Sequence, residues 1–520
     1  MRILERNSLI IVVVVALFTL FFGIGSIPLL DPDEPVYAET AREMIEWGDY
    51  LSPRIYNQFW FDKPPLYYWL VVIMQKIFGF TEFAARFPAA LMGALTTIMV
   101  YVAGAKFLSE RAGFWASLAL TSCVQFFYMS KGAVTDTTLL FFMTGALLAF
   151  INKNYWLMYV AMAFATLTKG PIGIVFPGII IFLYLFAMGK LDEIFRMHVI
   201  RGLLIYVLIC SPWYYGMYAV HGQKFIDGFF LFNNVTRFTT AEHAARVSFW
   251  YYFPVIILGL FPWTGLYFLS VKSCICESRS DEMRKLIFLH IWSGFVFIFF
   301  TICQTKLVSY ILPMFPAMAL SIGWYIAWME NRVRYNKILW SWIYSSGVTY
   351  LLLTIIWLVV AKFLPEVSAS IFILAASTFI LGAAACFTIY TYKDVQMASF
   401  IHVGTGILTM IVAFGFVLPA ISDRFSVKTL SAVYLAECRN DLPIHVDKFL
   451  RPGFKYYSRY AGEDMVPRTD DFSNALKNGE HKYFLLRGTM LRRFEKSDKL
   501  PQDVRVLKEK DDIYLLEQGN

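Results

Sequence analysis

The chain has 520 residues, of which 58% are hydrophobic and 16% are charged. A soluble protein with so few charges could not cover its own surface, so the composition excludes an ordinary soluble fold and indicates a membrane-embedded chain. The net charge of +8 does not indicate nucleic-acid binding, because the basic residues stand mostly singly between apolar runs.

Apolar runs long enough to cross a bilayer, on the order of 20 residues each, recur along most of the chain. The first is expected to be a retained helix rather than a signal peptide, since no small-residue cleavage site follows it. We expect about thirteen spans, near residues 8–27, 84–106, 113–129, 134–151, 154–168, 170–188, 202–220, 249–271, 286–303, 308–328, 338–361, 369–391 and 397–420.

The short loops between these spans carry most of the basic residues, including Lys106, Arg111, Lys153, Lys190 and Lys393. Lys and Arg accumulate in the cytoplasmic loops of membrane proteins. These loops and the N-terminus are therefore predicted to be cytoplasmic. The loops 28–83 and 221–248 and the tail 421–520 are then exported.

The tail differs in composition from the rest of the chain. Charged residues return and the apolar runs shorten to strand length, as at Tyr483–Leu486 and Ile513–Leu516. The sequence therefore predicts a transmembrane domain over residues 1–420 and a small exported α/β domain over residues 421–520.

The first exported loop combines acids with an amphipathic pattern. Asp33 and Glu34 stand where the first span meets water, and helical spacing begins at Tyr37. Apolar residues share one helix face and charged residues the other, which predicts a helix lying along the membrane interface. Farther on, Asp62 and Lys63 stand among aromatic residues.

Other ionisable residues occupy the exported ends of later spans. A charge in or beside a span is costly and usually faces an interior cavity. The alternative is a solvated cap or a snorkelling anchor for each residue taken singly. The recurrence of these charges at one depth favours a shared cavity, to which we assign Asp136, Lys169, Arg237, His243, Lys306 and the nearby Tyr310.

Such a set of residues favours one reaction class. Lys63, Lys169, Arg237 and Lys306 would hold a phosphate near the membrane surface. A carboxylate such as Asp33 would orient an attacking acceptor or take its proton. The residues thus predict group transfer from a lipid phosphate on the exported face.

These residues, in this order, resemble the membrane glycosyltransferases that use polyprenyl-phosphate sugars, in particular the bacterial aminoarabinose transferase and protein O-mannosyltransferase group. The likeness covers about residues 25–320, and the tail matches only in layout. The matching pieces are Asp33 to Glu39, Phe61 to Pro64, Thr135-Asp136, Thr168 to Gly170, Arg237-Phe238, Phe249 to Pro254, Pro262-Trp263 and Lys306 to Pro313.

The resemblance implies the GT-C fold, with interfacial helices in the first exported loop, and inverting sugar transfer from undecaprenyl phosphate to an envelope acceptor. The acceptor would be a lipid A-like lipid, a glycan or a protein, and the enzyme would lie among the lipids of a bacterial inner membrane. Asp33 would be the catalytic carboxylate, with Asp136 and Glu34 in the same cavity. Tyr37 would line the pocket, and the donor phosphate would contact Lys63, Arg237, Tyr310, Lys169 and Lys306.

These residues do not by themselves establish a cofactor, but some members of this group bind a divalent metal such as zinc. Its ligands here would be Asp62 and His243, but a lone His is more often a hydrogen-bonding residue. Val36 and the pair Asn233-Asn234 depart from the residues common in the group. The first departure counts against lipid A as acceptor and the second against a metal.

Two other classes of protein share parts of this pattern. A transporter or lipid flippase would place charges along a path through the membrane, whereas the charges here cluster at the exported rim. A structural subunit that kept the fold without activity would not need Asp33, Lys63 and Asp136.

Overall fold

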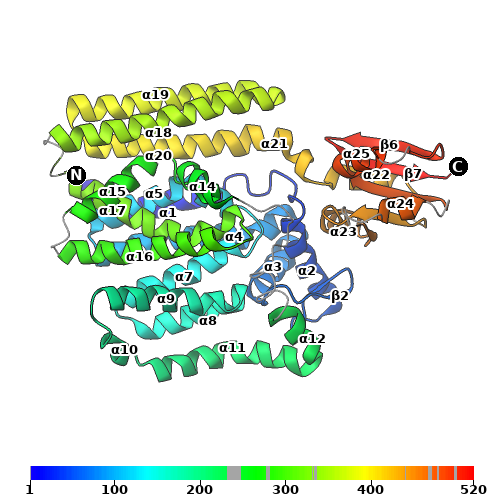
Figure 1. Ribbon diagram of the computed structural model, residues 1–520, viewed down its shortest axis with the longest axis horizontal. Helices are drawn as coiled ribbons and strands as arrows, with labels where there is room; N and C mark the ends of the chain where they lie inside the picture. Colours follow the sequence, from blue (N-terminus) through cyan, green and yellow to red (C-terminus); the bar gives the residue numbers. More distant parts are fainter. Residues whose placement is uncertain are drawn as a thin grey trace. The chain divides into compact units, whose positions relative to one another are not determined.

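The computed structural model describes residues 2–230, 248–276, 281–330, 332, 336–439, 441–465, 471–476, 480–496 and 500–519. The chain forms two compact units (Figure 1). The first unit comprises Met1–Phe22, Phe61–Tyr67 and Pro88–Phe416, and the second comprises Gly23–Trp60, Tyr68–Phe87 and Val417–Asn520. Part of the loop 28–83 thus belongs to the same unit as the tail. The division of the chain at residue 420 stays a prediction.

Helices make up the first unit, and their bounds follow the apolar runs. The helices up to residue 225 are α1 (Arg2–Phe21), α4 (Glu82–Phe107), α5 (Glu110–Ser122), α6 (Val124–Met129), α7 (Asp136–Ile151), α8 (Tyr155–Lys169), α9 (Ile172–Ala187), α10 (Glu193–Arg196), α11 (Val199–His221) and α12 (Gln223–Phe225). The later ones are η2 (Phe249–Tyr251), α14 (Tyr252–Gly259), α15 (Thr264–Cys276), α16 (Asp281–Ile302), η3 (Val308–Met314), α17 (Phe315–Glu330), α18 (Asn336–Phe363), η4 (Pro365–Val367), α19 (Ser368–Tyr392), α20 (Val395–Val412) and η5 (Ala413–Val417).

Within the described residues, seven helical stretches are long and apolar enough to cross a membrane, or eight if one bent pair is a single span. Shorter apolar helices include α7 and α9. The prediction of a multi-pass helical membrane protein is confirmed, whereas the number of about thirteen spans stays a prediction.

The expected span 249–271 is broken. Helices α14 and α15 meet at 108°, where Pro262 lacks the N–H that a continuous helix needs. The Trp263 indole donates to Ser122 Oγ at 2.9 Å, and Thr264 Oγ1 donates to Ile257 O at 2.7 Å. Neighbouring groups thus provide hydrogen-bond partners for polar groups at the break, which is needed because the bilayer core contains no water.

Helices α5 and α17 pack closely because small residues meet between them. Helix α17 is buried along nearly its whole length. A Cβ atom added to Gly323 would lie 2.2 Å from Ala112 O, so the contact requires glycine. Close approach of backbones is the usual basis of helix packing in a membrane.

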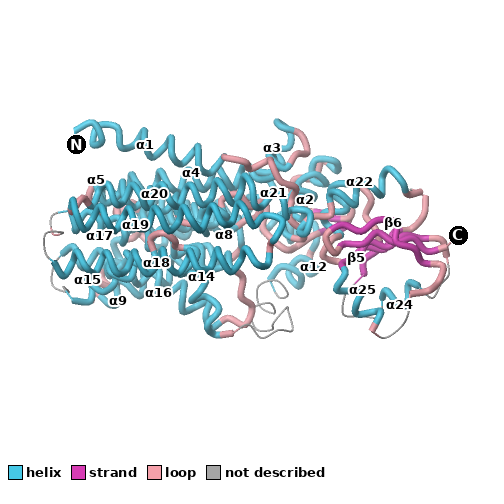
Figure 2. The backbone as a smooth tube through the Cα atoms, turned by 90° about the horizontal axis from the view of Figure 1, so that it is seen from above, coloured by secondary structure: helices cyan, strands magenta, loops and turns pink. Residues whose placement is uncertain are grey.

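The second unit contains a three-layer α/β domain, which confirms the small C-terminal domain expected from the tail. The five strands pair in the order β4-β3-β5-β7-β6 (magenta in Figure 2), with β3 parallel to both β4 and β5. The strands are β3 (Ile444–Asp447), β4 (Glu463–Met465), β5 (Lys482–Arg487), β6 (Val504–Lys510) and β7 (Ile513–Gln518), and the helices are α22 (Lys428–Glu437), α23 (Arg451–Ser458), α24 (Asp471–Leu476) and α25 (Gly488–Glu495).

Side chains of β5 alternate between two hydrophobic cores. Tyr483 and Leu485 pack in one core, with residues of α22 and α23. Phe484 and Leu486 pack in the other, with residues of α24 and α25. Because both faces of the sheet are covered, this strand reads as a continuous apolar run.

The remaining elements of the second unit come from the first exported loop and from the segment that precedes α22. Helix α2 (Asp33–Trp47) contacts both a short hairpin and α23. The others are β1 (Arg54–Ile55), β2 (Gln58–Phe59), α3 (Leu66–Phe78), α21 (Leu418–Ile421) and η6 (Ser422–Phe425).

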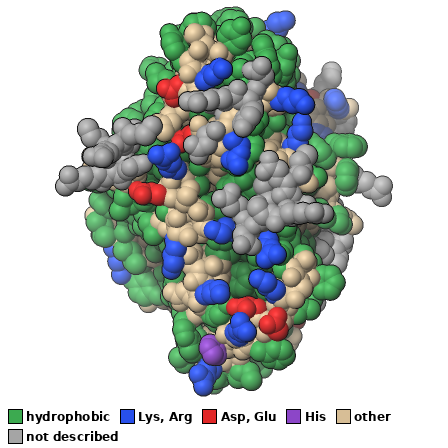
Figure 3. All heavy atoms as spheres, turned by 90° about the vertical axis from the view of Figure 1, so that its left-hand side faces the viewer, with side chains coloured by type: hydrophobic (Ala, Val, Ile, Leu, Met, Phe, Trp, Pro, Cys, Tyr) green, Lys and Arg blue, Asp and Glu red, His purple; other side chains and the backbone are tan. Residues whose placement is uncertain are grey.

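One end of the helical bundle is basic. Figure 3 shows Lys and Arg side chains spread over the face at which α16 and α18 begin, with few acids among them. Exposed Lys190 and Arg196 lie between α9 and α11, and exposed Lys393 lies between α19 and α20. Figure 1 places both connections at this same end.

The α5–α17 contact makes a stability prediction. Gly323→Ala should lower the melting temperature of the purified protein, because overpacking a tight site costs about 1–3 kcal/mol. Gly294→Ala is the matched control, since a Cβ atom there meets open space. Thermal unfolding in detergent measures the melting temperatures of both variants and of the wild type. A melting temperature of Gly323→Ala equal to that of the wild type would show that the contact can relax.

Candidate functional site

Two helix ends bring an acid and a lysine together in the first unit. Asp136 is the first residue of α7 and Lys169 the last residue of α8, and the two helices pack side by side. Lys169 Nζ lies 2.8 Å from Asp136 Oδ1, and both side chains are largely buried. Pairing of this kind is what makes a charge tolerable at such a depth.

Tyr310 completes this pair. It lies in η3, which contacts α7, and the Lys169 ammonium stands over its ring, 5.3 Å from the ring centre. A cation over an aromatic face is held electrostatically. The structure thus brings together three residues that lie far apart in the sequence.

Asp62 and Lys63 form a second acid–lysine pair. Lys63 Nζ lies 3.0 Å from Asp62 Oδ1, and the two side chains are only 16% and 14% exposed. A solvated surface pair would be far more exposed, so their burial favours the functional interpretation. Asp62 also lies near enough to Lys169 for its carboxylate to attract the ammonium group electrostatically. We call these five residues, Asp62, Lys63, Asp136, Lys169 and Tyr310, the lysine–carboxylate cluster.

No contact with the cluster is recorded for Lys306, the other predicted phosphate ligand that the structure describes. Lys306 is buried and donates from Nζ to Cys303 O at 2.6 Å. Arg237 and His243 lie outside the described residues.

The predicted catalytic acids stand at the start of α2, in the second unit. Asp33 is exposed, whereas Glu34 is buried. Both carboxylate oxygens of Glu34 accept hydrogen bonds from Arg86, at 2.8 and 2.5 Å, and one also accepts from Leu30 N. This geometry gives Glu34 a positioning contact, and its catalytic role stays a prediction.

Arg86 is a positioning residue that the sequence interpretation missed. Its guanidinium donates to three carbonyl oxygens, those of Ile24, Ile27 and Pro28, besides Glu34. The signal was present, because an arginine within the expected span 84–106 is costly unless it has a specific partner.

Helix α2 is buried on both faces. Tyr37 is buried and packs on Tyr68 with ring centres 5.7 Å apart, and its role in lining a substrate pocket stays a prediction. The charged face was expected to meet water, but Glu39 and Arg42 are buried. Helix α23 covers it, with Arg42 donating to Tyr456 O at 2.8 Å. The amphipathic pattern of the sequence does not indicate that another domain covers the charged face of this helix.

The metal expectation rests on residues that the structure describes only in part. Within the described ranges, no group of three or more His, Cys, Asp and Glu side chains could hold a metal ion. Asp62 is already close to the Lys63 ammonium, which would compete with a metal cation for the carboxylate.

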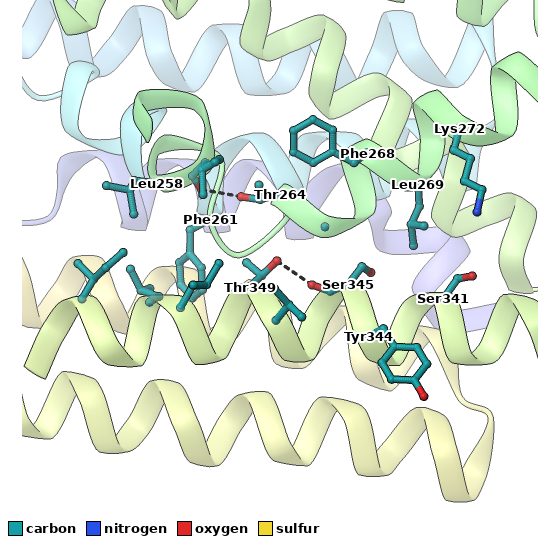
Figure 4. A pocket seen from close by; sticks show the side chains of 16 residues that line it. Leu258, Phe261, Thr264, Phe268, Leu269, Lys272, Ser341, Tyr344, Ser345 and Thr349 are labelled. Carbon is teal, nitrogen blue, oxygen red and sulfur yellow. Dashed lines mark hydrogen bonds between the residues drawn. The ribbon is translucent and has the colours of Figure 1, made fainter. Parts of the chain in front are cut away.

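An apolar pocket lies in the first unit, between the broken span and α18 (Figure 4). Its volume is ≈ 680 Å³. Leu258, Phe261 and Phe268 line one side, and Lys272 and Tyr344 lie toward one end. The lining is mostly apolar, and none of the lysine–carboxylate cluster belongs to it.

Comparison with known proteins finds a family model and several relatives that match part of the chain. Residues 62–215 match the family model described as dolichyl-phosphate-mannose-protein mannosyltransferase. An uncharacterized protein of Aquifex aeolicus is 30% identical over 322 residues, which are 60% of this chain and 63% of that protein. The undecaprenyl phosphate-alpha-4-amino-4-deoxy-L-arabinose arabinosyl transferase of Pectobacterium carotovorum is 29% identical over 345 residues, 64% of this chain and 61% of that enzyme. The chain therefore spans about three fifths of the length of these relatives.

Solved structures extend the likeness over the tail. The crystal structure of ArnT from Cupriavidus metallidurans bound to undecaprenyl phosphate superposes with a TM-score of 0.77 at 22% identity, covering 98% of this chain and 97% of that one. An oligosaccharyltransferase of Archaeoglobus fulgidus gives 0.52 at 11% identity, covering 94% and 70%. The resemblance to GT-C membrane proteins is confirmed, and the chain has their fold.

Glu39 makes the stability of the protein depend on pH. Burial raises the pKa of Glu39 to about 7, against the lowering effect of Arg42 and Lys455. Because the pKa is raised, the contribution of Glu39 to the free energy of unfolding is full below about pH 4.5. This contribution falls, by about 3 kcal/mol in all, as the pH rises through 7. Glu39→Gln should therefore unfold at a higher temperature than the wild type at pH 8 and at a similar temperature at pH 5.

The control is Glu46→Gln, because Glu46 is 41% exposed beside Arg459. Melting temperatures across pH 5 to 8 give the readout. If Glu39→Gln and the wild type change in parallel over this range, Glu39 is ionised throughout.

Proposed function

We propose that this multi-pass GT-C protein is a glycosyltransferase that moves a sugar from undecaprenyl phosphate to an acceptor of the bacterial envelope. The observation that carries the proposal is the lysine–carboxylate cluster. Two ammonium groups are each paired with a carboxylate, and that of Lys169, at the end of α8, also stands over the Tyr310 ring. All but Tyr310 fall within the segment that matches the mannosyltransferase family model.

The lysines act on the leaving group. Lys63 and Lys169 each keep N–H donors beyond the one directed at a carboxylate, and these donors bind the phosphate oxygens of the carrier. A phosphate leaves readily as an anion, so it needs charge stabilisation rather than a proton. The carboxylates keep the ammonium groups in place before the donor arrives.

Asp33 acts on the acceptor. Its exposed carboxylate takes the proton of an acceptor hydroxyl or amine as that atom attacks the anomeric carbon. The new glycosidic bond forms on one side while the bond from carbon to phosphate oxygen breaks on the other. The products are the glycosylated acceptor with inverted configuration and free undecaprenyl phosphate.

The donor sugar and the acceptor follow from the relatives only in part. The named relatives act with undecaprenyl phosphate-linked 4-amino-4-deoxy-L-arabinose, so this pentose is the first donor to test. A lipid A-like lipid, a glycan or a protein each remains an acceptor to compare. Mass spectrometry of lipids, glycans and proteins from a deletion strain identifies which of them loses a sugar.

We infer the orientation in the inner membrane from charge. Lys and Arg accumulate on the cytoplasmic side of membrane proteins, so the basic end of the bundle supports a cytoplasmic N-terminus and a periplasmic C-terminal α/β domain. A divalent metal held by Asp62 and His243 would supply a further positive charge for the phosphate.

Asp33→Asn should lower the transfer rate by about 100-fold or more, because an amide cannot take the acceptor proton. Release of free undecaprenyl phosphate by the purified protein in nanodiscs measures the rate. Asp441→Asn is the matched control, since Asp441 is exposed in a surface pair with Arg439. Wild-type transfer by Asp33→Asn would exclude Asp33 as the catalytic base.

Lys63→Ala and Lys169→Ala should each weaken binding of undecaprenyl phosphate by about 10-fold, the value of one charge-assisted hydrogen bond. The exposed Lys190 provides the control, as Lys190→Ala. Native mass spectrometry of the detergent-solubilised protein with undecaprenyl phosphate alone measures the affinities. An unchanged affinity in both variants would place the phosphate elsewhere.

A further inference from the structure

The segment before α2 is bound by the C-terminal residues of the second unit. Leu29 N donates to the Tyr457 hydroxyl at 2.7 Å, and Asp31 N donates to Phe425 O at 2.8 Å. These contacts join residues about 400 positions apart in the sequence. They fix the backbone immediately before Asp33.

The Asp31 side chain makes the most specific of these contacts. One carboxylate oxygen accepts a hydrogen bond from Val427 N at 2.9 Å, and the other accepts from Gly453 N at 3.0 Å. Val427 is the N-cap residue of α22, and Gly453 belongs to the first turn of α23. The N-cap residues of the two helices, Val427 and Leu450, make no capping hydrogen bond with their own side chains. One carboxylate therefore caps two helices, where N–H groups and helix dipoles favour an anion.

Gly453 leaves the space that this carboxylate fills. A Cβ atom at Gly453 would lie 2.2 Å from Asp31 Oδ1. Asp31 and Gly453 thus fit each other as a pair, and a side chain at residue 453 would displace the carboxylate.

The position in the α/β fold explains why a hydrogen-bond acceptor belongs here. Strand β3 has parallel neighbours on both sides and runs into α23. In open α/β sheets, the carboxyl ends of the strands around such a central strand are where ligands bind. Here the chain's own Asp31 meets the helix that follows β3.

Helix α2 is held to the same domain farther along. Arg42 donates to the carbonyl oxygens of Tyr456 and Lys455, at the C-terminal half of α23. Arg86 meanwhile fixes Glu34, the residue after Asp33. Asp33 is therefore flanked by anchors on both sides while its own side chain stays exposed.

We propose that Asp31 is a positioning residue through which the C-terminal α/β domain holds the Asp33 carboxylate in its working place. Asp31 touches no substrate. The proposal rests on the function proposed above for Asp33. It assigns the C-terminal domain a part in the reaction, namely to fix the catalytic loop by its α22 and α23 helices.

Three variants test the pair: Asp31→Ala, Gly453→Ala and the double variant. Each single change should lower kcat by about 10- to 100-fold, since a displacement of about 1 Å can cost this much. Binding of undecaprenyl phosphate alone should stay within about twofold of wild type, because the cluster lysines are untouched. The double variant should be no worse than Asp31→Ala, because the side chain that Gly453→Ala displaces is already gone.

Hydrogen exchange separates this proposal from the function on which it rests. Amides of residues 33–47 should exchange faster in both single variants, with those of α7 and α8 unchanged. Asp441→Ala, in the same domain, should match the wild type in exchange and in rate.

Each alternative outcome has one meaning. Faster exchange with wild-type kcat overturns the positioning role and leaves sugar transfer intact, and additive losses in the double variant overturn the pairing. A loss of folded protein with unchanged kcat per folded molecule would make Asp31 a purely structural residue. If the wild type transfers no sugar from any donor, the proposed function fails, while the exchange data still report whether Asp31 clamps α2.

Discussion

The structure depends on the rule that a charge beside a bilayer needs a partner. Asp136 and Lys169 meet at 2.8 Å, and Glu34 meets Arg86 with both oxygens. In a low dielectric an unpaired member of either pair would cost several kcal/mol, as a rough figure. Each pair consequently fixes the element that carries it, so the same interaction that keeps the fold intact also places polar groups for chemistry.

The two kinds of pair serve different ends. The N–H groups of Arg86 donate hydrogen bonds to three carbonyl oxygens and one carboxylate, and all of these contacts hold the loop. Among the described residues, Lys63 pairs with Asp62 and Lys169 with Asp136. An ammonium group has three N–H donors, so each lysine can also bind another anion. A lipid-linked phosphate is the anion that a membrane protein with this geometry is suited to receive. The distinction between a saturated and an unsaturated cation thus separates structural charges from charges that can act.

The C-terminal α/β domain fits the same logic. Its helices offer free N–H groups that the chain satisfies with Asp31 rather than with neighbouring caps. A soluble domain would leave such a place for a ligand. In this chain the contact of Asp31 with α22 and α23 connects the domain to the loop that carries Asp33. The domain therefore has a role in holding that loop.

The sequence by itself determined that the chain is a multi-pass helical membrane protein, and it predicted strands at Tyr483–Leu486 and Ile513–Leu516, which lie within β5 and β7. It also singled out the residues of the lysine–carboxylate cluster, whose roles stay predictions. Apolar length and alternation are local properties, and charges within apolar runs stand out one by one. Tertiary structure decided what local patterns cannot express. The break at Pro262, the burial of Glu39 and Arg42 under α23, and the partners of Arg86 and Asp31 all depend on segments far apart in the chain. A charged helix face looks solvated until its partner is known, because burial is a property of the pair and not of the helix.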